Sequence, residues 1–164
     1  MSGTQAHENF FDEFFQSSEK KEEKSPLEVK ISEERLKWTN KIEEMSKRMK
    51  KVFELSELMT YVYTERQRGV EYHHYLISIL SKINRSYRKQ WSEKYNHYSY
   101  KSQKRFPNEK TKELQILSEL NDIIKKRDLL DNHSKFIENT IRTIDNIIYG
   151  IKYRIEIEQI ARGK

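Results

Sequence analysis

Hydrophobic residues recur every three or four positions along most of this chain, which is the spacing of amphipathic helices. The first such pattern contains Leu36, Ile42, Met45, Met49, Val52, Leu55, Met59 and Val62. Ser32 is a candidate N-cap, because two acidic residues follow it in the first turn. The pattern therefore predicts a long helix over residues 33–68, which ends at Gly69.

The same spacing continues after Gly69 and predicts a second helix over residues 71–95. Glycine at the junction allows either a tight antiparallel return or a kink in one longer helix. The stretch 96–110 is polar, contains proline and is predicted to be a loop.

The last third of the chain contains the most regular pattern. Two helices are expected over residues 111–131 and 133–161, and Asn132 either caps the second helix or lies inside one continuous helix. Isoleucines at alternating spacings of four and three form a seam: Ile137, Ile141, Ile144, Ile148, Ile151 and Ile155. Isoleucine at both seam positions of a coiled coil favours assemblies larger than a dimer.

These patterns predict an all-α protein, with long amphipathic helices in a helical hairpin or bundle that assembles into a homo-oligomeric ring or open barrel. Only 35% of the residues are hydrophobic, so one chain has little apolar surface from which to build a core. We therefore assign the isoleucine seam to subunit contacts; the alternative is that it faces the chain's own helices. The expected organisation is a flexible segment 1–32, a helical hairpin 33–110 and an oligomerisation region 111–164.

The N-terminal segment has a distinct composition. Phe10, Phe11, Phe14 and Phe15 lie among acidic residues, and a charged, serine-containing stretch follows them. That stretch is typical of a solvated linker. The spacing of the phenylalanines could form one apolar face of a short helix that docks on a partner. The same face could equally pack on this chain's own helices or on a neighbouring copy.

Residues 82–105 contain eight lysines and arginines and one acidic residue, Glu93, so they carry +7 where the whole chain carries +6. Aromatic rings are interleaved with these cations. Cations bind phosphates and release counterions, and flat rings stack on any base. The segment therefore predicts a surface for single-stranded nucleic acid without strong sequence preference. The candidate residues are Lys82, Arg85, Tyr87, Arg88, Lys89, Trp91, Lys94, Tyr95, Tyr98, Lys101, Lys104 and Arg105.

A solvated basic face with aromatic core residues is the simpler interpretation of this segment. Tyr87 and Trp91 continue the phase of Ile79 and Ile83, which places their rings toward the core in that interpretation. A basic helix could also bind an acidic protein or anionic lipid. The tyrosines, and an apolar face already used by the core, favour nucleic acid over a membrane.

The sequence contains no pattern typical of an enzyme. Cysteine is absent, which excludes disulfides and zinc–thiolate sites. There is no glycine-rich phosphate loop, and the single Glu71-x-x-His74 step lacks the second copy that a di-iron bundle requires. No catalysis, cofactor or metal is expected. Neither a signal-peptide pattern nor an 18-residue apolar run is present, so a cytoplasmic protein is expected.

Three stretches of the chain resemble the UvsY-like recombination mediators of T-even-type bacteriophages. The first is Lys37-Trp38-Thr39-Asn40-Lys41, and the second is the basic stretch that runs from Arg85 into the tyrosines at Tyr98. The third is the C-terminal helix, with Glu138-Asn139-Thr140-Ile141, Asn146-Ile147-Ile148 and Ile151-Lys152-Tyr153-Arg154. The likeness covers roughly residues 33–164, and no counterpart is found for the phenylalanine-rich segment.

The resemblance implies a helical protein that forms open, barrel-like rings, commonly heptamers, in the cytoplasm of an infected host cell. Such proteins bind single-stranded DNA, contact the single-strand binding protein, and help a RecA-like recombinase to assemble during recombination and repair. They do not hydrolyse nucleotides. The role of the basic ring-rim residues is carried onto Arg85, Arg88, Lys89 and Lys94, and that of the ring contacts onto the isoleucine seam.

A second interpretation belongs to a different class. Long helices with one basic loop are also typical of a non-enzymatic structural or scaffold coiled-coil protein that meets an acidic partner. Binding to a protein-free oligonucleotide, and its dependence on salt, separates the two interpretations.

Overall fold

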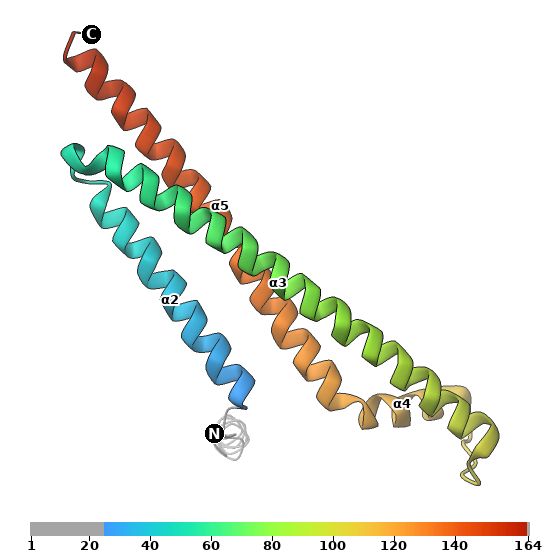
Figure 1. The fold of residues 1–164 in the computed structure, drawn as a ribbon. Helices are drawn as coiled ribbons and strands as arrows, with labels where there is room; N and C mark the ends of the chain where they lie inside the picture. Colours follow the sequence, from blue (N-terminus) through green and yellow to red (C-terminus); the bar gives the residue numbers. More distant parts are fainter. Residues whose placement is uncertain (1–24, 164) are drawn as a thin grey trace, which may run out of the picture.

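A computed structural model describes residues 25–163 as an assembly of helices (Figure 1). The α-helices are α2 (Pro26–Arg48), α3 (Leu55–Asn96), α4 (Glu109–Glu119) and α5 (Asn121–Ala161). A 3-10 turn, η1 (Val52–Glu54), precedes α3, and a π-helical turn, η2 (His97–Lys101), follows it. No strand occurs within residues 25–163. The predicted all-α class is confirmed.

Helix α2 begins earlier than the sequence pattern predicts. Ser25 is the N-cap: its side chain accepts a hydrogen bond from the backbone N–H of Glu28, whose carboxylate accepts one from the Ser25 backbone. Pro26 follows at the first helical position, where its missing N–H costs nothing. Ser32 lies inside the helix and donates its hydroxyl to the Glu28 carbonyl, so its expected capping role was wrong.

The first break between helices also lies at a different position from the one that the sequence predicts. Helix α2 ends at Arg48, and α3 then runs without interruption through Gly69. Gly69 is buried where three helices cross: a Cβ at this position would lie 3.2 Å from Ile141 Cγ1 and 3.4 Å from Trp38 Cη2. The glycine therefore permits close helix packing, and the predicted break or kink at this residue is corrected.

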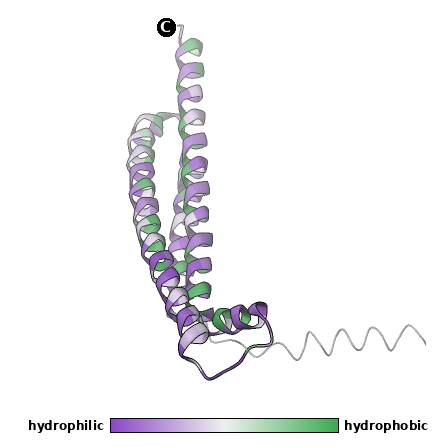
Figure 2. Cartoon of the chain, turned by 90° about the vertical axis from the view of Figure 1, so that its right-hand side faces the viewer, coloured by the Kyte–Doolittle hydropathy of each residue, from purple (hydrophilic) through white to green (hydrophobic). Residues whose placement is uncertain are grey.

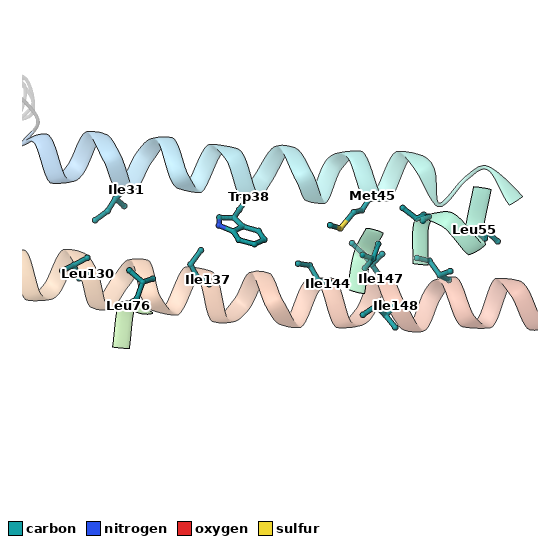
Figure 3. Close-up of a cluster of buried hydrophobic side chains, with 13 residues drawn as sticks. Ile31, Trp38, Met45, Leu55, Leu76, Leu130, Ile137, Ile144, Ile147 and Ile148 are labelled. Carbon is teal, nitrogen blue, oxygen red and sulfur yellow. The ribbon is translucent and has the colours of Figure 1, made fainter. Parts of the chain in front are cut away.

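The core lies between α2, α3 and α5. Buried residues repeat every seven positions in α2 and in α5, and pair as Ile31 with Leu130, Trp38 with Ile137, and Met45 with Ile144 (Figure 3). Both helices run in the same direction, and α3 runs antiparallel to them and packs mainly against α5 (Figure 1). Leu55, Leu58, Val62 and Leu76 are the buried apolar residues of α3. Hydrophobic residues recur at intervals along otherwise polar helices (Figure 2).

The isoleucine seam of α5 faces the chain's own helices. Ile137, Ile144, Ile148 and Ile151 are buried among α2 and α3, and the two other seam residues, Ile141 and Ile155, are partly buried against the same core. The four buried residues have no surface left for a second subunit and belong to the intrachain core, which is the alternative interpretation, whereas Ile141 and Ile155 keep part of their surface exposed.

A buried glutamate and a partly exposed ion pair fix the register of the three helices. Glu65 is buried in α3 and pairs with Lys41 of α2 and with Arg68 of its own helix. Arg66 Nε lies 2.5 Å from Asp145 Oδ1 and links α3 to α5. A one-residue slip would separate these charges, so they favour a single alignment of the helices.

Among the described residues, the distal half of α3, residues 77–96, packs mainly with η2, α4 and α5. The first turns of α2 lie beside Leu129 and Asn132 of α5, so α2 does not extend along this half (Figure 1). Asn132 lies inside one continuous helix, α5, which is the second of the two expected alternatives, and the helix break lies at Leu120, between α4 and α5. α4 therefore turns back across the end of α3 (Figure 1). Among residues 25–163, no helix combines the length and apolar composition needed to cross a bilayer.

Candidate nucleic-acid interface

The structure gathers the predicted nucleic-acid residues at one end of the molecule. Those on distal α3 are Lys82, Arg85, Tyr87, Arg88, Lys89, Trp91, Lys94 and Tyr95. Tyr98 and Lys101 lie in η2, and Lys104 and Arg105 lie in the segment that leads to α4. These residues do not form one uniform surface, because some of them are engaged in contacts within the chain.

Four exposed cations follow one another along α3: Lys82, Arg85, Arg88 and Lys89, which we call the α3 cationic face. The first three make no ion pair with any residue in the described range 25–163, and Lys89 Nζ lies 3.9 Å from an exposed glutamate oxygen, Glu93 Oε1. The face extends about 10 Å along the helix axis, at 1.5 Å per residue. Unpaired exposed cations on a rigid helix are suited to contact phosphates without prior ordering.

A shallow groove of about 450 Å³ lies beside this face. It is lined by Ile77, Leu80, Ser81, Asn84, Arg85 and Arg88, and we call it the α3 groove. Ile77 is 46% exposed although it is large and apolar, and Leu80 is half-buried. The groove thus combines apolar side chains at one end with two guanidinium groups at the other, and no carboxylate lines it.

Lys94 and Tyr98 stabilise the end of the molecule instead of facing solvent. Lys94 Nζ lies 2.5 Å from Glu119 Oε2, and the Tyr98 hydroxyl donates to the other oxygen of Glu119. Hydrogen bonds from Lys94, Tyr98 and Gln115 lower the pKa of Glu119 to about 2. The bond to the carboxylate raises the pKa of Tyr98. These contacts hold η2 against α4. Lys94 and Tyr98 are therefore less available to contact a ligand.

The predicted aromatic residues are largely paired with cations from other elements. The Lys112 ammonium lies 4.1 Å from the Tyr95 ring centroid, and the Arg127 guanidinium lies 5.4 Å from that of Tyr87. The Tyr87 and Trp91 rings lie 6.1 Å apart, and both residues are half-buried. Tyr87 and Trp91 therefore correspond to the simpler interpretation, in which they line the core side of α3.

The remaining loop residues differ in their freedom. Lys104 donates to the Gln115 side chain at 3.2 Å and lies 5.2 Å from the Phe106 ring centroid. Lys101 and Arg105 are exposed and form no ion pair within the described range. Tyr100, which is absent from the predicted set, is 83% exposed and has the freest aromatic ring of the segment. Its position in a turn after the helix end was the available signal for its exposure.

Sequence reasoning also missed the contribution of α5. Lys126 and Lys82 line a second groove of about 490 Å³, between α3 and the start of α5. Asp122 and Glu119 line the same groove, so its charge is mixed. The basic run at residues 125–127 is visible in the sequence, but only the antiparallel packing of α3 and α5 places it beside the α3 cationic face.

Two further points concern the phenylalanine-rich segment and metal binding. Phe10, Phe11, Phe14 and Phe15 lie outside the described residues. Within residues 25–163, no cluster of three or more histidine, aspartate or glutamate side chains is arranged to hold a metal ion.

Comparisons of the chain with protein-family models, curated proteins and solved structures found no match.

Proposed function

We propose that this protein binds single-stranded DNA through the α3 cationic face and acts as a recombination mediator. The observation that carries the proposal is the row of exposed cations at Lys82, Arg85 and Arg88, which form no ion pair with the described residues. Tyr100 supplies an exposed ring within the same end of the molecule. Phosphates would bind the cations, and a base would stack on the ring.

Binding of this kind tolerates any sequence. The cations project from the surface of one helix, and the groove beside them is shallow, so no element enters a duplex groove to read base edges. Contacts to phosphates position a strand but carry no sequence information. The interface therefore suits a protein that must act wherever single-stranded DNA appears.

The role as mediator draws its support from the resemblance to UvsY-like proteins. In this role the protein forms a homo-oligomeric ring, a heptamer by the resemblance, and repeats the cationic face around one rim. Weak contacts on each subunit then sum to tight binding. The strand is held in a shape that disfavours the single-strand binding protein and favours the RecA-like recombinase, in the cytoplasm of the infected cell.

A ring requires an apolar face other than the enclosed isoleucine seam. The C-terminal part of α5 extends past the connection between α2 and α3 (Figure 1). Its outer side presents exposed apolar residues at spacings of four, four and three: Tyr149, Tyr153, Ile157 and Ile160. We assign this row to contact with a second copy. The double substitution Tyr153→Glu and Ile157→Glu should reduce the mass measured by light scattering to that of one chain.

The test of DNA binding is a fluorescence-anisotropy titration of a poly-dT strand of ~30 nucleotides at several salt concentrations. The Arg85→Ala, Arg88→Ala variant should bind more weakly, and its salt slope should fall by about 0.7 for each phosphate that the variant no longer binds. A matched control replaces Lys50 and Lys152, two exposed cations near the α2–α3 connection at the opposite end. Absence of binding at low salt would refute the proposal and leave the scaffold interpretation.

The mediator step needs a separate assay. Adding the protein to a strand coated with single-strand binding protein should shorten the lag before a RecA-like recombinase begins to hydrolyse ATP. The Arg85→Ala, Arg88→Ala variant should leave the lag unchanged from that without mediator. If the wild-type protein binds DNA but never shortens the lag, DNA binding stands and the mediator role is refuted.

A further inference from the structure

The α3 groove has the chemistry of a binding site for an acidic, aromatic segment. Ile77 and Leu80 offer an apolar contact, and Arg85 and Arg88 offer positive charge. Neither arginine has an ion-pair partner within residues 25–163, and no carboxylate lines the groove. A ligand that brings both phenyl rings and carboxylates would satisfy both parts at once.

The sequence of this chain contains such a segment ahead of α2. Glu8, Asp12 and Glu13 alternate with the four phenylalanines Phe10, Phe11, Phe14 and Phe15. The described structure begins at Ser25, whose capping box starts α2. Ile31, in the second turn of α2, packs in the same core cluster as Leu76, and Leu76 directly precedes the first residue of the groove (Figure 3). The described start of α2 therefore lies near the Ile77 end of the groove.

The intervening chain is long enough to reach. Residues 16–24 connect Phe15 to Ser25, and nine residues span up to about 30 Å when extended. The groove runs along α3 from Ile77 to Arg88, which is about 17 Å of helix. The extended length of residues 16–24 exceeds the length of the groove. The phenylalanines of a chain could therefore lie against its own Ile77, with the acidic residues against its own arginines.

We infer that residues 8–15 of this chain dock in its own α3 groove, with phenyl rings on Ile77 and Leu80 and carboxylates on Arg85 and Arg88. The groove shares its two arginines with the α3 cationic face. The docked segment therefore competes with single-stranded nucleic acid, and this second part rests on the proposed function. Carboxylates take the place of phosphates, and phenyl rings take the place of bases.

Docking is tested first, without nucleic acid, by disulfide cross-linking of the full chain. The chain has no cysteine, so a Ser17→Cys, Ser81→Cys pair is the only thiol pair present. Ser81 lines the groove, whereas Ser32 is exposed on α2 within reach of the same tether, seven residues from Ser25, and serves as the control partner for the same Ser17→Cys substitution. An intrachain disulfide should form several-fold faster with the cysteine at position 81 than with the one at position 32.

The substitutions Phe10→Ala, Phe11→Ala, Phe14→Ala and Phe15→Ala should remove that difference. Equal rates at the two positions, or a difference that persists without the phenylalanines, would overturn the docking. A disulfide found only between chains, at the mass of a dimer, would show that the occupant is a second copy and would overturn docking within one chain.

Competition is tested by anisotropy with the same four-alanine variant. It should bind the poly-dT strand about three- to tenfold more tightly at low salt, because the arginines are no longer occupied. Phe53→Ala is the matched control, since Phe53 is 88% exposed near the α2–α3 connection. If cross-linking favours position 81 but the affinity does not change, competition is refuted and docking stands. If no DNA binds to any variant, the proposed function fails while the cross-linking result still decides the docking.

Discussion

His133 should make the stability of this protein depend on pH just below neutrality. Its ring is buried in the core, with Nε2 3.0 Å from the Tyr72 hydroxyl and the ring stacked on Phe136. Nδ1 is buried and has no partner among the described residues, whichever tautomer is present. Burial lowers the pKa of His133 below its ordinary value of 6.5, Arg35 lowers it further, and Glu34 opposes this shift.

The sign of the effect follows from which state binds the proton. Above pH 6.5 the imidazole is neutral in both states and pH has no effect through this group. As the pH falls below 6.5, His133 binds a proton in the unfolded chain but stays neutral in the folded protein. The free energy of unfolding therefore decreases with falling pH until the pKa of folded His133 is passed. The slope for one group is at most about 1.4 kcal/mol per pH unit.

The assay is urea unfolding, followed by circular dichroism, at several pH values between about 7.5 and 5, where histidines rather than carboxylates titrate. The wild-type free energy of unfolding should fall across this range. His133→Gln stays neutral and can still bond Tyr72, so its free energy should depend less on pH. His74→Gln is the control, because His74 is exposed. A His133→Gln curve parallel to the wild-type curve would refute the reasoning.

Four further substitutions probe other parts of the structure. Gly69→Val should lower the free energy of unfolding by about 1–3 kcal/mol, because the helix crossing has no room for its methyl groups. Gly150→Ala should raise it by about 0.5–1 kcal/mol, because its Cβ would meet only the flexible end of a methionine, 2.9 Å away; a urea titration measures both. Glu65→Ala should lower the free energy of unfolding by about 2 kcal/mol in the same titration. The loss is smaller than for one partner of a fully buried ion pair, because Lys41 stays one-third exposed. Glu119→Gln should speed hydrogen exchange in residues 97–108 but change the free energy of unfolding by no more than about 1 kcal/mol.

Periodicity predicted the helices of this protein well and their breaks poorly. The apolar spacing indicates which residues form a stripe, but a stripe continues in phase across a short turn, as it does between Met45 and Leu55. Gly69 is a helix breaker by propensity, yet tertiary packing favours an unbroken helix because a glycine lets three helices approach closely. The helix-propensity penalty of glycine, about 1 kcal/mol, is smaller than the free energy that side-chain packing contributes at a helix crossing.

The sequence predicted which segment concentrates the positive charge, but not which of its residues are free and which are engaged within the chain. Composition alone identified the basic segment, because charge density does not depend on the fold. The division into free and engaged residues needed the structure, since Glu119, which holds Lys94 and Tyr98, lies more than twenty residues further along the chain. The isoleucine seam illustrates the same limit: its spacing indicates a partner helix but does not say whether that helix belongs to the same chain.

The structure separates folding from the proposed binding surface along α3. Its first half packs with α2 and α5 and contains the buried charge and the helix crossing, whereas its distal half packs on α4 and α5 and presents the cations to solvent. Arg85 and Arg88 are exposed and form no ion pair with the described residues, so replacing both should leave the urea midpoint unchanged while DNA binding weakens. A fall in both quantities would mean that the cationic face supports the fold, and the separation would then be wrong.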